Sequence, residues 1–247
     1  MTLPAEEVSL TGRSRARPAG RVLVDGGDAA GRNVRVLVVD DHRVVAESVA
    51  LAIDLQPDLQ CVGIAGTVAE ALAMLLSQDP DVVLTDVQLP DGDGVDAARR
   101  LIDLNPGLRI LVLTAHTDVA VMARAAAAGV SGFLPKETSI GAVLSALRRA
   151  AKGEMPVEGS VLSALLDRAR ADRRETPPIR VTDREREVLQ RLSQGLDLQT
   201  IAGQLGISIH TCRGHVKRLF GKLDAHSQLE AVVKAGQLGL LPDLGLV

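Results

Sequence analysis

Short apolar runs alternate with amphipathic segments along the first two thirds of the chain. The runs at 34–39 (VRVLVV), 60–65 (QCVGIA), 82–86 (VVLTD), 109–114 (RILVLT) and 132–135 (GFLP) have the length and composition of strands buried on both faces. Segments with helical periodicity follow each run, at about 44–56, 67–77, 94–104, 118–128 and 138–152. This alternation predicts an α/β fold, a five-stranded doubly wound parallel sheet covered by helices on both faces.

The rest of the chain divides into three parts. Residues 1–33 show neither helical nor strand periodicity and are predicted to be a disordered leader, so that the α/β domain spans 34–152. Prolines and glycines bracket one possible helix within 153–178, which indicates an interdomain linker. From 179 to 247 the pattern is helical, with short connections at Gly195, Gly206 and Asp224, and predicts a small all-α domain of four helices.

Composition and charge narrow the functional classes. The 247 residues include two Phe and no Tyr or Trp, which makes aromatic cages and base-stacking grooves implausible. Residues 34–152 carry 10 Lys and Arg against 15 Asp and Glu, whereas residues 179–247 carry 9 against 7, so the two domains differ in charge sign. The two cysteines, the lack of a long apolar run and the lack of a signal sequence predict a cytoplasmic protein without a membrane partner.

Polar residues stand at the carboxyl ends of the predicted strands. They are Asp40 and Asp41 after the first strand, Asp86 after the third, Thr114 after the fourth and Lys136 after the fifth. In a doubly wound sheet these ends meet at one crevice, where ligands bind. Three crowded carboxylates repel one another unless a cation compensates them, and an all-oxygen site of this kind suits Mg²⁺. A hydroxyl and an ammonium nearby predict phosphoryl chemistry at an aspartate.

The helical segment 182–223 carries the second signal. Thr182 and Glu185 form a predicted capping box, and Ser208 is a predicted N-cap of the longest helix. One face of that helix is apolar: Cys212, Val216, Leu219 and Leu223. The opposite face carries Arg213, Gly214, Lys217, Arg218 and Gly221. Two short helices, a glycine turn and a helix with a basic face are typical of a helix-turn-helix that binds double-stranded DNA.

The motifs VLVVDDH, VVLTDVQLPDGDG, ILVLTA and GFLPKE resemble, in order and spacing, those of two-component receiver domains. The resemblance covers about 34–152 and implies a flavodoxin-like receiver whose phosphoacceptor is Asp86. It implies that Mg²⁺ is bound by Asp40, Asp41, Asp86 and the main-chain carbonyl of Gln88. It also implies that Thr114 and Lys136 hold the phosphoryl group and that Phe133 is a rotating aromatic that reports it. His42, near the crevice, is expected to be a solvated rim residue.

Residues 180–242 are similar to the LuxR-type domain of NarL/FixJ regulators, through TDREREVL, TCRGHVKRLFGKL and SQLEAV. The likeness implies that Arg213, Gly214 and Lys217 face base edges, that Thr211, Arg218 and Lys222 lie near phosphates, and that a helix at about 227–236 mediates dimerisation. Gln199 and Gln228 stand where relatives often carry cations, which predicts weaker DNA binding with a shallower salt dependence.

These features together predict a DNA-binding transcription regulator rather than an enzyme. A sensor histidine kinase would phosphorylate Asp86, and the active form would bind DNA as a homodimer. Three alternatives stay open: an orphan regulator controlled without phosphate, a Mg²⁺-dependent phosphohydrolase, and a small-ligand sensor joined to the DNA-binding domain. Against the phosphohydrolase, Gln88 stands where the haloacid-dehalogenase type needs a second Asp. Against a sensor of acyl-homoserine lactones, the chain has no Trp or Tyr.

Overall fold

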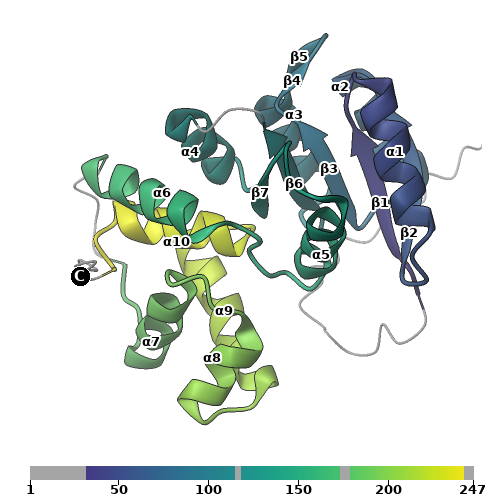
Figure 1. Ribbon diagram of the computed structural model, residues 1–247. Coiled ribbons are helices and arrows are strands. Elements are labelled where there is room, and N and C mark those ends of the chain that lie inside the picture. Colours follow the sequence, from purple (N-terminus) through teal and green to yellow (C-terminus); the bar gives the residue numbers. More distant parts are fainter. Residues whose placement is uncertain (1–31, 115–117, 173–178, 242–247) are drawn as a thin grey trace, which may run out of the picture.

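A five-stranded parallel sheet forms the first domain. The computed structural model describes residues 32–114, 118–172 and 179–241. The strand order is β2-β1-β3-β6-β7 (Figure 1). These strands are β1 (Val34–Val39), β2 (Leu59–Ala65), β3 (Val82–Asp86), β6 (Arg109–Thr114) and β7 (Gly132–Pro135). The five predicted strands, their parallel pairing and the flavodoxin-like order are therefore confirmed.

Helices cover both faces of this sheet, as predicted from the alternating pattern. They are α1 (Arg43–Asp54), α2 (Val68–Gln78), α3 (Gly94–Leu104), α4 (Val119–Ala127) and α5 (Ile140–Ala151). Alternate residues of β1 point to opposite sides: Val36 and Val38 pack with α1 and α5, whereas Leu37 and Val39 pack with α2 and α3. Both faces are apolar because both are buried, which explains the uninterrupted apolar runs.

A short antiparallel hairpin follows β3 and was not predicted. It consists of β4 (Gln88–Leu89) and β5 (Gly92–Asp93). Asp91 lies in the turn of this hairpin, and its carboxylate accepts hydrogen bonds from the N–H groups of Val68 and Ala69 at the start of α2. Asp93 caps α3 by accepting from the Val95 N–H at 2.7 Å. The hairpin therefore orients the starts of two helices.

Five further helices lie in the described C-terminal residues, 159–172 and 179–241. They are α6 (Gly159–Ala171), α7 (Asp183–Leu192), α8 (Leu198–Leu205), α9 (Ile209–Leu223) and α10 (Gln228–Gln237). The predicted capping box at Thr182 and Glu185 is present, and Ser208 caps α9. Gly206 adopts a left-handed conformation between α8 and α9 (φ 63°), as a helix-turn-helix turn requires.

Three further predictions from the sequence concern the leader, the two cysteines and the membrane. The predicted leader lies outside the described residues except for Arg32 and Asn33. Both cysteines are unpaired, Cys212 buried and Cys61 half-buried. No helix in the described ranges combines the length and the apolar character that crossing a bilayer would require.

Candidate functional site

Two buried carboxylates lie at the carboxyl end of the sheet. Asp40 directly follows β1 and Asp86 is the last residue of β3; they are 3% and 6% exposed. In the sheet, β2 lies on one side of β1 and β3 lies on the other. The strand order therefore reverses at β1, and the topological switch point lies between β1 and β3. The apolar strands thus end in two buried carboxylates, and a buried charge without a partner costs free energy.

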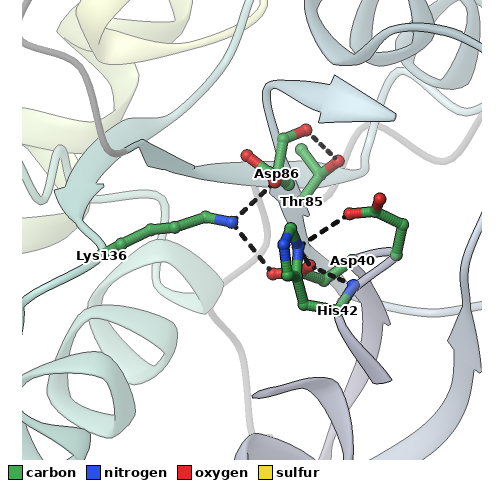
Figure 2. A network of polar contacts seen from close by, with 6 residues as sticks. Asp40, His42, Thr85, Asp86 and Lys136 are labelled. Atoms are coloured by element: carbon green, nitrogen blue, oxygen red, sulfur yellow. Dashed lines mark hydrogen bonds and ion pairs between the residues drawn. The ribbon is translucent and has the colours of Figure 1, made fainter. Parts of the chain in front are cut away.

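Lys136 supplies a compensating charge from the loop after β7. Its Nζ donates to Asp86 Oδ2 at 2.6 Å and to Asp40 Oδ2 at 3.4 Å. Figure 2 shows the side chain reaching across the crevice to both acids. Burial by itself would lower the pKa of Lys136, but the hydrogen bond to Asp86 and the negative charges of Asp40 and Asp86 raise it above its ordinary value. The ammonium is therefore charged at physiological pH.

Asp41 and His42 complete the rim of the crevice. His42 Nδ1 lies 2.9 Å from Asp41 Oδ1 and 3.1 Å from Asp40 Oδ1. The His42 side chain is 66% exposed, in agreement with a position at the rim, but its ring contacts the acid pair rather than standing free in solvent. One ligand atom from each of Asp40, Asp41, His42 and Asp86 fits within 4.8 Å of the others. This contact of His42 with the acids was not predicted from the sequence.

The other predicted phosphoryl-site residues occupy neighbouring strand ends. Thr114 is the last residue of β6, and its carbonyl accepts the Lys136 N–H at 2.9 Å, so their backbones are adjacent. Phe133 lies in β7 and is 4% exposed, so the aromatic ring is already buried in this structure. Gln88 begins β4, beyond the end of β3, and its side chain is exposed. All of them therefore lie at or next to the same end of the sheet.

Gly94 is a residue that the sequence analysis did not single out for the site. A Cβ at this position would clash with the carbonyl oxygen of Asp86 and lie 2.9 Å from that of Val87. The Gly94 N–H donates to the Val87 carbonyl at 2.7 Å. The start of α3 thus packs directly on the backbone that carries Asp86, and only glycine permits this approach. The repeated glycines of DGDG were the available signal.

The donor set of the crevice fits a hard divalent cation. Asp40, Asp41 and Asp86 offer carboxylate oxygens from two adjacent strand ends. Lys136 already binds two of the three acids, which shows that the crevice is arranged to hold positive charge. Oxygen ligands with room for water suit Mg²⁺.

Helix α9 presents the second group of predicted residues. Cys212, Val216, Leu219 and Leu223 are buried, as the periodicity predicted. Thr211, Lys217, Arg218, Gly221 and Lys222 are exposed, and Arg213 and Gly214 are half-buried. The helix therefore has the apolar and basic faces that the sequence predicted.

Two of the predicted phosphate contacts also serve the packing of α9 on α7. Lys222 Nζ donates to Glu185 Oε2 at 2.6 Å, and Arg218 Nε lies 3.7 Å from Glu185 Oε1. Glu185 is only 1% exposed, and burial alone would raise the pKa of its carboxyl. The hydrogen bonds from Lys222 and from the Thr182 N–H instead hold that pKa below its usual value. The members of this ion pair are 37 residues apart in the sequence, and it was not predicted.

Comparisons with known proteins agree with both halves of the chain. Residues 36–148 match the response regulator receiver domain family, and residues 180–235 match the LuxR family of bacterial regulatory proteins. The chain is 35% identical over 206 residues to the DNA-binding transcriptional activator DevR/DosR of Mycobacterium tuberculosis, covering 83% of this chain and 95% of that protein. The chain belongs to the NarL/FixJ family of response regulators.

Other relatives match the whole two-domain chain or about half of it. The response regulator is 32% identical over 208 residues to VraR of Staphylococcus aureus, covering 84% of this chain and 99% of that one. A solved LuxR-family response regulator from Aurantimonas is 26% identical, covers 55% of this chain and 97% of its own, and has a TM-score of 0.51. RcsB of Salmonella typhimurium, at 24% identity and a TM-score of 0.51, covers 81% of this chain and 97% of its own and shares the fold.

Proposed function

We propose that this response regulator controls transcription and that a phosphoryl group on Asp86 switches its DNA binding. The observation that carries the proposal is the position of Lys136, whose ammonium lies between the buried carboxylates of Asp86 and Asp40. The positive charge of Lys136 partly neutralises the negative charges of the two carboxylates. A phosphoryl group on Asp86 adds negative charge to the site and so changes which groups Lys136 binds. The same chain carries a helix-turn-helix whose α9 has an exposed basic face.

The phosphoryl donor would be a phosphohistidine of a sensor histidine kinase. A carboxylate oxygen of Asp86 attacks the phosphorus atom, the phosphorus–nitrogen bond breaks, and the departing imidazole takes a proton from water. Lys136 is within reach of the new phosphoryl oxygens because it already binds Asp86 at 2.6 Å. The Thr114 hydroxyl, at the end of the adjacent strand β6, would hydrogen-bond a second oxygen.

Asp40, Asp41, Asp86 and the Gln88 carbonyl would hold Mg²⁺, which neutralises negative charge on the transferring phosphoryl group when it is bound. His42 is a neighbour of this set rather than a preferred Mg²⁺ ligand. Phe133, buried within β7, the strand that leads to Lys136, would respond to movement of Thr114. These roles are implied by the resemblance to receiver domains, and the placement of the residues at one end of the sheet supports them.

DNA would be the ligand of the C-terminal helices. Arg213, Gly214 and Lys217 would face base edges, with Thr211, Arg218 and Lys222 near phosphates. The 35% identity to the DNA-binding transcriptional activator DevR/DosR supports this function. Binding as a homodimer to two half-sites would compensate for the small number of cations on α9. The family works in the cytoplasm, and we assign this chain to that compartment.

The family consists of transcription regulators, which in general are not enzymes, and we propose that this chain turns over no substrate. The alternative phosphohydrolase lacks its second acid, because Gln88 stands two residues after Asp86. The alternative of control without phosphate is disfavoured by the buried acid pair, which is costly to retain without use.

The function is tested by DNA capture from a genomic fragment library with acetyl phosphate and Mg²⁺, followed by affinity measurement on the recovered site. The unaltered chain is expected to bind more tightly after phosphorylation, and Asp86→Asn is expected to bind at the unphosphorylated level in both conditions. Lys217→Ala should take up phosphate normally but lose DNA affinity. Equal affinity of the unaltered chain and Asp86→Asn in both conditions would refute the proposed control.

A further inference from the structure

An apolar groove lies between the outer sides of α2 and α3. Both helices cover the same face of the sheet and contact each other. The groove is lined by Leu72, Ala73 and Leu76 of α2 and by Arg100, Asp103 and Leu104 of α3. Leu76 and Leu104 are 61% and 58% exposed. Two such leucines at one groove form an apolar patch that no residue in the described ranges covers, and a patch of this kind indicates an interaction site.

Two charged side chains accompany these leucines. Arg100 and Asp103 are both exposed. Among the residues that the structure describes, neither side chain has an ion-pair partner. A segment that fills the groove can therefore bring one acidic and one basic group of its own to these two charges.

The chain enters the sheet beside this groove. Asp81, in the loop after α2, accepts hydrogen bonds from the guanidinium of Arg32 and from the N–H of Arg35, each at 2.9 Å. Arg35 Nε donates to the carbonyl of Gln78, the last residue of α2, at 3.2 Å. The leader therefore joins the described chain at the end of α2 that carries Leu76.

One segment of the leader has the composition of a buried strand. Residues 21–25 read RVLVD, with three consecutive apolar residues between an arginine and an aspartate. The letters RVLV recur at 35–38, where they form most of β1 and all three apolar residues are buried. Side chains of this kind gain free energy when they leave water. Residues 21–25 therefore have both the apolar side chains and the two charges that the groove can bind.

The connection to the sheet is long enough for this contact. Seven residues, 25–31, separate Val24 from Arg32, and this stretch can span about 25 Å when extended. Leu72 is six residues before Gln78, a distance of about 9 Å along the helix axis. A short tether also gives the segment an effective concentration of about a millimolar at the groove, which favours it over a free partner of the same affinity.

We propose that residues 21–25 dock in the groove between α2 and α3, with the side chain of Leu23 between Leu76 and Leu104. The proposal departs from the prediction of a disordered leader for these five residues alone. It concerns the opposite end of the two helices from the acidic crevice and requires no phosphoryl group. It therefore goes beyond the proposed function, and either can fail without the other.

Opposite charges fix the direction of the docked segment. Asp25 pairs with Arg100, and Arg21 pairs with Asp103, after which the chain returns to the sheet. The reverse direction brings like charges together. Exposed ion pairs contribute little free energy, so the apolar contacts supply most of the affinity and the charges select the orientation.

Trypsin cleavage after Arg21 tests the docking in the full chain. Docking protects this peptide bond, and its rate of cleavage follows the fraction of undocked molecules. Leu76→Asp should raise the rate about tenfold or more, because the contact of one buried leucine is lost. Leu51→Asp is the matched control, since Leu51 lies on α1, on the other face of the sheet, and is 64% exposed. Cleavage after Arg15, which lies outside the docked segment, should be equally fast in all of these proteins.

Leu104→Asp, on the other helix of the groove, should have the same effect as Leu76→Asp. Equal rates after Arg21 in the unaltered chain and in both groove variants would overturn the proposal. Equal and fast rates would mean that the leader is free, and equal and slow rates that it docks elsewhere, for example on the free edge of β2. Light scattering on the same samples excludes the remaining occupant: a dimer of the unaltered chain that Leu76→Asp dissociates would place a second copy in the groove and also overturn the proposal.

A charge variant tests the direction of docking. Arg100→Gln removes the partner of Asp25 and should raise the rate of cleavage after Arg21 by up to about fivefold, as for an exposed ion pair. Arg99→Gln is the matched control, because the neighbouring Arg99 lines a different pocket, with residues of α4 and α10. Equal rates in the two variants would overturn the pairing of Asp25 with Arg100.

Discussion

Replacing Lys136 by Met removes the positive charge shared by two buried carboxylates. The Lys136 Nζ lies 2.6 Å from Asp86 Oδ2 and 3.4 Å from Asp40 Oδ2, and the two acidic side chains are 8% and 2% exposed. The variant leaves both acids without this partner in an apolar surrounding. We therefore expect a loss of stability that a divalent cation can restore.

The magnitude follows from the exposure of the pair. Removing one partner of a fully buried ion pair costs about 3–5 kcal/mol. The Lys136 side chain is 24% exposed, so water screens part of the interaction. We expect a loss of about 2 kcal/mol in metal-free buffer, which for a chain of this size lowers Tm by about 4–8 °C.

Calorimetry in EDTA and in saturating Mg²⁺ measures this effect. Mg²⁺ should stabilise Lys136→Met more than the unaltered chain, because the variant lacks the competing ammonium. In the Asp86→Asn background the same substitution should cost about half as much, since one of the two carboxylates is gone. Arg148→Met is the control, and its exposed ion pair should contribute less than about 1 kcal/mol with no dependence on Mg²⁺.

Two outcomes would refute this reasoning. The first is a Lys136→Met protein as stable as the unaltered chain in EDTA. The second is an equal gain from Mg²⁺ in both proteins, which would mean that the ammonium does not compete for the acidic crevice.

Four further substitutions test other parts of the molecule. Gly94→Ala should lower the free energy of unfolding by about 1–3 kcal/mol because its Cβ clashes with the Asp86 carbonyl, whereas Gly141→Ala in α5, with open space around it, should stabilise by about 0.5–1 kcal/mol; urea unfolding compares them. Glu185→Gln should destabilise α7 to α10 by about 1–3 kcal/mol at neutral pH. Because the pKa of Glu185 is lowered on folding, its stabilisation exists above the unfolded pKa of about 4.3 and disappears as pH falls through the folded value. On acidification, Glu185→Gln should therefore lose less stability than the unaltered chain does. Hydrogen exchange of α7 to α10 measures this, and the same pH dependence of protection in both proteins would contradict it. Lys217→Ala should weaken binding to the specific site more than binding to unrelated DNA, because Lys217 is proposed to face base edges. An equal loss of affinity for both DNAs would remove Lys217 from the base-edge contacts.

The layered fold was predictable because a parallel sheet covered by helices buries both faces of its strands. Strands buried on both sides must be apolar throughout, and the runs at 34–39 and 82–86 could hardly be anything else. The crevice followed because parallel strands end at the same edge, which brings Asp40, Asp86 and Lys136 together despite their separation in sequence.

Other features depend on contacts that local pattern does not encode. The β4–β5 hairpin has only two residues in each strand, too few for a period to show. The pair of Glu185 and Lys222 joins the start of α7 to the end of α9. The sequence predicted Glu185 as part of a capping box and Lys222 as a phosphate contact, and neither pattern indicates that the two side chains meet. The packing of α10 on α4 and α6 was likewise not predictable. The apolar stripe of a helix shows that this face is buried, but it does not identify the element that covers it.

The central claim is that Asp86 accepts a phosphoryl group in a crevice where Lys136 and Mg²⁺ compensate the acids. Its most direct measurement is reductive trapping of the acyl phosphate with borohydride after treatment with acetyl phosphate and Mg²⁺, followed by peptide mapping in a mass spectrometer. The account predicts that the modified residue is Asp86, that Asp86→Asn carries no label, and that Lys136→Met alters the yield or lifetime of the label. Label on another residue, or none on the unaltered chain, would contradict it.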